Sequence, residues 1–206
     1  MKLYFSQNSP FVRKTLVIIH ECALIDAIEI TETTVRPAAP NREYGDTVSP
    51  LRQIPALETD DGEVLVDSLT IADYLIRRSG TSRLLPAEGD RRTMLLRNHQ
   101  MINGLMERAV QTRYELSFRP EEMRWPEMIA DNKDRILTGL SWIEQRSEQF
   151  DGELTLASAA LVAFVKYLDF RFDDWQWRGH VPALAALAAQ LEEQPSVKAA
   201  YAIKPA

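Results

Sequence analysis

The spacing of apolar residues changes character once along this 206-residue chain, near residue 79, and that change limits the folds open to it. Before it, short alternating runs typical of strands occur between segments with helical spacing. After residue 90, apolar residues recur only at helical spacing. We therefore expect an α/β domain at residues 1–78, a linker at 79–89 and an all-α domain at 90–206.

The first 78 residues predict the order βαβ followed by ββα. Ser9 is a favoured N-cap and Pro10 a favoured first helical residue, so a helix should begin after the first strand. The first two strands should pair in parallel, because a helical crossover joins them. The expected segments are a strand at 2–5, a helix from 10, a strand at 27–33, a polar loop with room for one helical turn at 36–48, hairpin strands at 55–57 and 64–66, and a helix capped by Ser68.

The remaining sequence predicts a helical bundle. The segment 155–170 is apolar on nearly every face and should form the buried centre of the bundle. The other helical segments are amphipathic and should pack around it. They are a long helix beginning at Asp90, a helix within 125–150 and a helix at 182–194.

Composition narrows the possible functions. The net charge of −6 disfavours nucleic acids and anionic membranes as partners. No apolar segment approaches the ~20 residues that span a bilayer, and the first ten residues lack the character of a signal peptide, so we expect a cytoplasmic protein. The single cysteine, Cys22, permits no intramolecular disulfide and is expected in the core. The three histidines lack metal-ligand spacing, so no metal is expected.

The predicted hairpin raises a question at its first residue, Pro55. Proline has no N–H to donate to a neighbouring strand, so it is unusual at the start of a buried strand. One interpretation is that Pro55 protects an exposed sheet edge. The other is that something else uses the backbone at Ile54. The hairpin leads directly to Asp67-Ser68, where a helix start would offer unpaired N–H groups to an anion.

Three segments stand in a defined order along the chain. They are "SPFVRK" from Ser9, "IPAL" from Ile54 with "DDGEVLVDSLTIADYL" from Asp60, and "YLDFRF" from Tyr167. Together they resemble the glutathione S-transferase family in its bacterial cytosolic form. The resemblance covers essentially the whole chain. It implies a thioredoxin-like N-terminal domain, a C-terminal α-helical bundle, a homodimer and a role in detoxification.

The resemblance also implies where glutathione binds. Pro55 would be cis, and the backbone of Ile54 would pair with the cysteinyl backbone of glutathione. Ser68 would bind the α-carboxylate of the γ-glutamyl group, and Asp67 would approach its ammonium. Gln53 would reach the glycyl carboxylate. A solvated loop residue is an equally good interpretation of Gln53, and an ordinary helix cap is an alternative for Ser68.

Ser9 is the residue that the resemblance assigns to catalysis. A free thiol has a pKa near ~8.5, so little of it is ionised at neutral pH. A hydroxyl that donates to sulfur favours the thiolate, as does the positive end of a helix. Glutathione, as co-substrate, would be the nucleophile. Ser9 could instead be a cap alone, with Ser6 or Asn8 as the donor. The turn contains no cysteine, which excludes dithiol exchange.

Several other positions carry weaker expectations. The candidates for an electrophile pocket, each of which could equally be core or surface, are Phe11, Arg108, Gln111 and Tyr114. We expect Arg13 and Lys14 on a solvated helix face, and the alternative for Arg13 is that it raises the local potential one turn from Ser9. Arg52 stands where relatives often have glycine, which leaves the loop shape open. Thr155 and Ser158 stand where relatives have a Ser/Thr-x-x-Asp capping box, and the shorter partner should weaken the cap by about 0.5–1 kcal/mol.

The function implied by the resemblance is transfer of glutathione to a small electrophile, whose identity the sequence leaves open. Two other classes remain: a non-catalytic glutathione-binding or protein-interaction module of the same fold, and a glutathione-dependent peroxidase or isomerase. All of them would share the residues named above.

Overall fold

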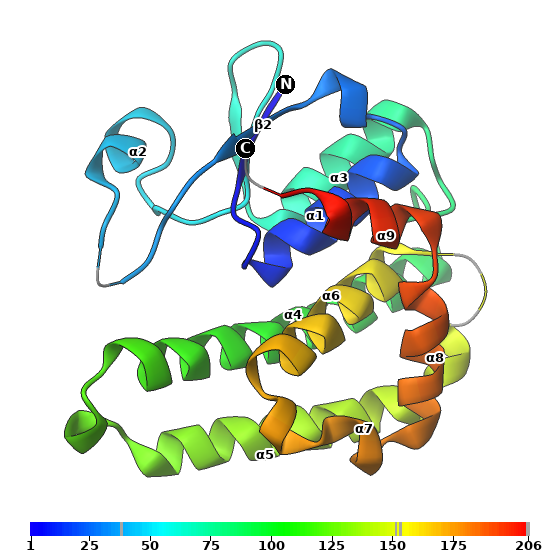
Figure 1. The fold of residues 1–206 in the computed structure, drawn as a ribbon. Helices are drawn as coiled ribbons and strands as arrows, with labels where there is room; N and C mark the ends of the chain where they lie inside the picture. Colours follow the sequence, from blue (N-terminus) through cyan, green and yellow to red (C-terminus); the bar gives the residue numbers. More distant parts are fainter. Residues whose placement is uncertain (38, 151, 153, 205–206) are drawn as a thin grey trace. The chain divides into compact units, whose positions relative to one another are not determined.

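The computed structural model describes residues 1–37, 39–150, 152 and 154–204, and its contacts divide the chain into two units (Figure 1). Unit 1 comprises Met1–Ala87 together with Gln194–Ala206, and unit 2 comprises Glu88–Glu193. The end of the chain therefore groups with the N-terminal part, whereas the expected boundaries placed it with the helical domain.

Unit 1 contains a four-stranded sheet in the order β2-β1-β3-β4. Its strands are β1 (Lys2–Phe5), β2 (Glu29–Glu32), β3 (Ala56–Glu58) and β4 (Val64–Val66). β1 pairs in parallel with β2, as predicted, and β3 is antiparallel to both β1 and β4. The second strand is shorter than expected because Ile25–Ala27 forms a 3-10 turn, η1. Alternate residues of β1, Leu3 and Phe5, are buried in the core.

The helices of unit 1 pack on one another as well as on the sheet. They are α1 (Pro10–Glu21), the short α2 (Arg42–Thr47), α3 (Ser68–Ser79) and α9 (Pro195–Ala202). α1 contacts both α3 and α9, and Figure 1 shows the three helices side by side. The sequence did not indicate α9 as a separate helix. Pro195, the residue after the expected helix at 182–194, is the first residue of α9.

The expectation that Arg13 and Lys14 lie on a solvated face of α1 is wrong. Arg13 is 7% exposed and Lys14 is fully buried. Arg13 lies against α9, and its guanidinium is directed at carbonyl groups and aromatic rings instead of solvent. Packing of α9 on α1 therefore buries a face of α1 that was expected in solvent because its residues are charged.

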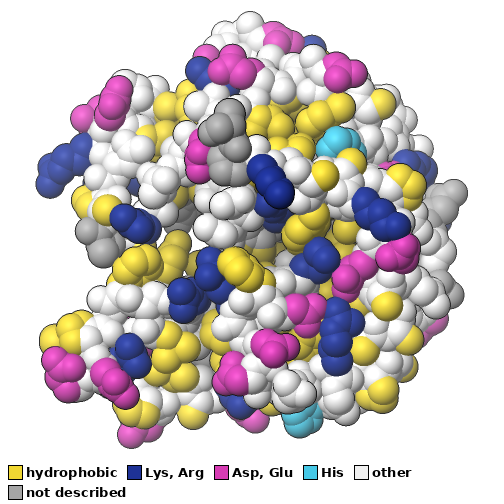
Figure 2. Space-filling model, viewed as in Figure 1, with side chains coloured by type: hydrophobic (Ala, Val, Ile, Leu, Met, Phe, Trp, Pro, Cys, Tyr) yellow, Lys and Arg dark blue, Asp and Glu magenta, His cyan; other side chains and the backbone are white. Residues whose placement is uncertain are grey.

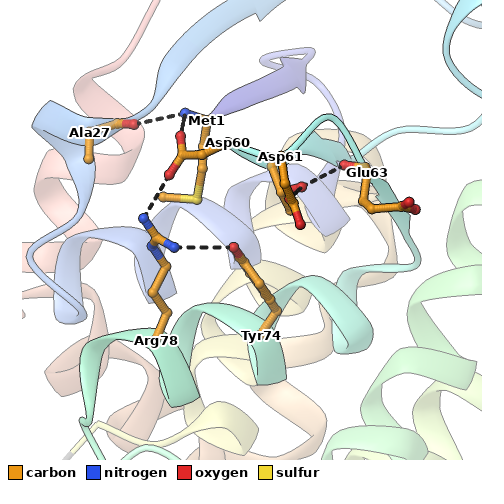
Figure 3. Close-up of polar contacts among 8 residues, drawn as sticks. Met1, Ala27, Asp60, Asp61, Glu63, Tyr74 and Arg78 are labelled. Atoms are coloured by element: carbon orange, nitrogen blue, oxygen red, sulfur yellow. Dashed lines mark hydrogen bonds and ion pairs between the residues drawn. The ribbon is translucent and has the colours of Figure 1, made fainter.

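The N-terminus is fixed to the hairpin by charged groups (Figure 3). The Met1 ammonium donates to Asp60 Oδ1 at 2.7 Å and to the Ala27 carbonyl at 3.3 Å. Arg78 on α3 donates to the other oxygen of Asp60 at 2.7 Å. One exposed carboxylate thus links β1, the β3–β4 turn and α3.

Among its described residues, unit 2 contains helices and connecting turns but no strand. Its main helices are α4 (Asp90–Phe118), α5 (Pro126–Glu144), α6 (Leu156–Arg171), α7 (Trp177–His180) and α8 (Pro182–Glu192), with 3-10 turns at Glu121–Met123, Ser147–Gln149 and Asp173–Trp175. α6 packs against α4 and α8 and is buried along nearly its whole length, as predicted. α5 is shorter than the predicted segment. The chain turns after Glu144, yet Phe150 is still buried.

The N-terminus of α6 shows that Thr155 and Ser158 do form a reciprocal capping box. Thr155 Oγ1 accepts from the Ser158 N–H at 3.2 Å, and Ser158 Oγ accepts from the Thr155 N–H at 2.7 Å. Serine therefore replaces the longer acidic partner without loss of either bond.

The surface carries charges of both signs. Figure 2 shows Lys and Arg interspersed with Asp and Glu over the visible face. In the part of the chain that the structure describes, no helix is both long enough and apolar enough to cross a membrane.

Candidate functional site

Strand register brings three predicted site segments to one edge of the sheet in unit 1. Tyr4 of β1 pairs with Ala56 at the start of β3, and Ala56 in turn pairs with Val66 at the end of β4. The turn leading to Ser9, the segment before Pro55 and the start of α3 therefore all leave the sheet at this edge. This is where the sequence predicted a ligand site.

Ser9 is the N-cap of α1, as predicted. Its backbone is extended, and its Oγ accepts from the Val12 N–H at 3.4 Å. Within the described residues, its hydroxyl donates to no acceptor. The first turn of α1 carries no acidic side chain, so the positive end of the helix dipole is not offset there. Ser9 can therefore accept the helix bond and still donate a proton to an incoming anion.

The peptide bond between Ile54 and Pro55 is cis, as the resemblance implied. β3 begins only at Ala56. Among the residues that the structure describes, neither the N–H nor the C=O of Ile54 forms a hydrogen bond. Ile54 thus presents one donor and one acceptor at the sheet edge, available to an extended ligand backbone.

Tyr44 supports this segment and was missed by the sequence analysis. Its hydroxyl donates to the Gln53 carbonyl at 2.8 Å, and its ring meets Tyr4 edge-on at 5.3 Å. Burial, with a smaller effect of Tyr4, raises the pKa of Tyr44 to about 12, so the phenol stays a donor. The sequence signal that could have identified Tyr44 is its aromatic side chain in an otherwise polar loop. The Gln53 side chain itself is exposed.

The start of α3 differs from the prediction in which residue caps it. Asp67, not Ser68, is the N-cap: its Oδ1 accepts from the Leu69 and Thr70 N–H groups at 2.7 and 3.3 Å. Asp67 has φ +70°, a conformation that is strained for a residue with a side chain. Because Asp67 satisfies two N–H groups, Ser68 need not cap. Its own N–H and hydroxyl have no partner among the described residues.

The loop before Pro55 has a positive φ, typical of glycine, at Arg52, the position where relatives often have glycine. Arg52 has φ +48°, and its N–H donates to the Ser49 carbonyl at 2.9 Å. Its aliphatic stem lies over Gly45, where an added Cβ would be 3.1 Å from Arg52 Cγ and Cδ. A side chain at position 52 strains the backbone, but the Arg52 side chain also packs against Gly45 of α2.

The four candidate electrophile residues belong to two different units. Phe11 lies in the first turn of α1 and is half-buried. On α4, the exposed Arg108 donates to Gln111 Oε1 at 3.2 Å. Tyr114 is 36% exposed, and its ring lies 5.7 Å from that of Phe118. Burial raises the pKa of the Tyr114 phenol, so it is a neutral donor.

Other chemistry-bearing groups do not join this site. Cys22 is buried at the C-terminal end of α1, as expected, and burial raises the pKa of its thiol. Its sulfur is therefore poorly suited to form a reactive thiolate. In the described part of the chain, no three His, Cys, Asp or Glu side chains lie close enough together to hold a metal ion.

Comparisons with known proteins agree with this architecture. A family model described as "Glutathione S-transferase, N-terminal domain" matches residues 8–78. A glutathione transferase family member from Pseudomonas fluorescens Pf-5, solved with bound glutathione, is 32% identical and superposes with a TM-score of 0.93 over 97% of both chains. The fold class of this protein is thus a thioredoxin-like domain together with a helical domain. The chain belongs to the glutathione transferase family.

Two curated relatives are more distant. The "Uncharacterized GST-like protein YibF" of Escherichia coli (strain K12) is 27% identical over 202 residues, which span 95% of this chain and 96% of that protein. Maleylacetoacetate isomerase of Mus musculus is 28% identical over 131 residues, which span 58% of this chain and 56% of that protein.

Proposed function

We propose that this chain is a glutathione transferase of the serine type, which binds glutathione in the domain at residues 1–78 and ionises its thiol. The observation that carries the proposal is that the Ile54 backbone has no hydrogen-bond partner among the described residues and lies at the same end of the strands as Ser9, whose hydroxyl proton is available for donation. The glutathione bound to the Pseudomonas relative supports the choice of ligand.

Each end of glutathione then has a matching group. The cysteinyl backbone pairs with Ile54 beside Pro55. The α-carboxylate takes the free N–H and hydroxyl of Ser68, and the α-ammonium faces the exposed carboxylate of Asp67. The side-chain amide of Gln53 donates to the glycyl carboxylate. These contacts place the sulfur toward the first turn of α1.

Ser9 lowers the thiol pKa by donating to the sulfur. Depression by two pKa units needs about 2.7 kcal/mol of differential stabilisation. A hydrogen bond to a charged group contributes about 1.5–3 kcal/mol, and a helix N-terminus adds about 0.3–1 kcal/mol. The two effects together are of the required size, so no further catalytic group has to be invoked.

The electrophile class is a separate part of the proposal. Phe11, in the same helical turn as the Ser9 cap, is the proposed contact of a small electrophile, and roles for Arg108, Gln111 and Tyr114 stay predictions. We also propose a cytoplasmic homodimer with a role in detoxification. An isomerase that uses glutathione is the second candidate, because the chain resembles maleylacetoacetate isomerase over 131 residues. Such an enzyme would use the same thiolate without forming a lasting conjugate.

The experiment is calorimetric titration with glutathione, followed by kinetics of wild type, Ser9→Ala and Ser9→Thr. Ser6→Ala is the matched control, because it removes a hydroxyl from the same turn. We expect binding in all four proteins. For Ser9→Ala alone, the pKa of the bound thiol should rise by about one to two units, which lowers the thiolate fraction and kcat at pH 7 by about threefold to thirtyfold. The acceptors are an aromatic halide, a hydroperoxide and a cis-enone, which distinguish transferase, peroxidase and isomerase. Absence of glutathione binding by wild type would refute the proposal.

A further inference from the structure

The buried guanidinium of Arg13 joins two parts of unit 1 that the proposed mechanism leaves unconnected. Its Nε donates to the Gln7 carbonyl at 3.0 Å. Its Nη1 donates to the carbonyls of Ala200 at 2.6 Å and Ile203 at 3.1 Å. The first acceptor lies in the turn that ends at Ser9, and the other two lie at the C-terminal end of α9. One side chain on α1 therefore holds both segments.

The surroundings of Arg13 fix the plane of its guanidinium. Its central carbon lies 5.5 Å from the centre of the Phe5 ring and 5.1 Å from that of Tyr201. Burial lowers the pKa of Arg13, an effect that the nearby Tyr201 partly opposes. Two aromatic rings and carbonyls in different directions suit a planar group with several donors, and suit a lysine ammonium poorly.

A simpler explanation accounts for only two of the three hydrogen bonds of Arg13. Basic side chains often bond the last carbonyls of a helix, and Arg13 does this for α9. That role gives no reason for the bond to Gln7, which belongs to no helix. Gln7 lies two residues before Ser9, in a turn closed by the Ser9 N–H, which donates to the Ser6 carbonyl at 3.1 Å. Arg13 therefore also braces the turn that orients Ser9.

We propose that Arg13 is a positioning residue for glutathione activation, which fixes the Ser6–Ser9 turn and makes it depend on the C-terminal helix α9. This inference rests on the proposed role of Ser9. The direction of the Ser9 hydroxyl then depends on an element 187 residues away in sequence from Arg13. A change at the end of α9 should alter ionisation of bound glutathione without touching any group that binds it.

The test compares the fraction of bound glutathione present as thiolate, read from its ultraviolet absorbance at neutral pH, with the midpoint of thermal unfolding. Arg13→Met should raise the pKa of bound glutathione by about one unit, from about 6.5 to about 7.5, which reduces the thiolate fraction and kcat at pH 7 about threefold. Arg13→Lys should recover part of the loss. A chain ending at Ala202 retains α9 but lacks the Ile203 acceptor, and should show a smaller loss. KM for glutathione should rise no more than about threefold, the factor that weaker binding of the thiolate itself requires, because Ile54 and Ser68 are unaltered.

A matched control separates positioning from stability. Arg178 in unit 2 donates to Asp169 and Glu192, so Arg178→Met should lower the unfolding midpoint and leave the thiolate fraction unchanged. An Arg13→Met protein with a lower midpoint but wild-type thiolate and kcat would overturn the inference. Should that variant fail to fold, the Arg13→Lys and shortened chains decide by the same readout. Glutathione that binds wild type without ionising would instead refute the proposed function, and this role of Arg13 with it.

Discussion

Replacing Asp67 should separate two contributions of one side chain, a helix cap and a negative charge. Its Oδ1 accepts from Leu69 and Thr70 at the start of α3. Loss of such a cap lowers the free energy of unfolding by about 1 kcal/mol. We therefore expect Asp67→Ala to be about 1 kcal/mol less stable than wild type.

The backbone at Asp67 makes glycine a better replacement than alanine. Asp67 has φ +70° and ψ +128°, a sparsely populated positive-φ conformation that costs a residue with a side chain about 1–3 kcal/mol. Glycine avoids this strain, although its greater freedom in the unfolded chain offsets about 0.5–1 kcal/mol. Asp67→Gly should thus exceed Asp67→Ala in stability by about 0.5–1 kcal/mol. Asp67→Asn keeps an acceptor oxygen and should stay within about 0.5 kcal/mol of wild type.

Glutathione binding should follow a different order. All three variants lose the charge that faces the α-ammonium, and each should bind glutathione about tenfold more weakly, equal to about 1.4 kcal/mol. Urea unfolding measures the stabilities, and calorimetric titration measures the affinities. Wild-type affinity in Asp67→Asn would refute the ammonium contact. Equal stability of the alanine and glycine variants would refute the strained backbone.

Two further predictions concern stability. An added methyl group at Gly139 would lie 2.4 Å from Leu105 Cδ1, so Gly139→Ala should lower the free energy of unfolding by about 1–3 kcal/mol. Among the described residues, nothing lies within 4 Å of a Cβ built at Gly104, so Gly104→Ala should raise the free energy of unfolding by about 0.5–1 kcal/mol. Urea unfolding measures both variants, and equal effects of the two substitutions would contradict the close packing of Gly139 on Leu105. The Met1 ammonium, followed by Arg78, holds the pKa of Asp60 below its usual 3.8. The ion pairs of Asp60 therefore add to the free energy of unfolding above the usual pKa, and this stabilisation is lost as the pH falls through the lowered pKa of the folded state. Asp60→Asn should be less stable than wild type at neutral pH but equal to it in acid, whereas a pH-independent difference in unfolding midpoint would count against the ion pair.

The parts of the fold that local sequence determines were predictable. The Lys2–Phe5 strand and the start of α4 at Asp90 have the predicted bounds. Ser9 caps α1 as expected, because an N-cap acts on N–H groups only two or three residues away. Pro55 at the start of a strand raised the question of what uses the backbone at Ile54, and only the family resemblance chose between the two interpretations.

The features that depend on distant contacts were not predictable. Arg13 was expected in solvent because its neighbours along the helix include another cation, but its burial is decided by α9. Tyr44 supports Gln53 through the fold of a loop without regular spacing. Asp67 and Ser68 are both good N-caps, so propensity alone could not choose between them.

The central claim is tested most directly by a crystal structure of the protein with glutathione. We predict that the cysteinyl N–H and C=O pair with the Ile54 backbone, that the γ-glutamyl carboxylate meets Ser68, and that the sulfur lies within hydrogen-bonding distance of Ser9 Oγ. A glutathione bound away from Ile54, or a sulfur out of reach of the Ser9 hydroxyl, would contradict the account.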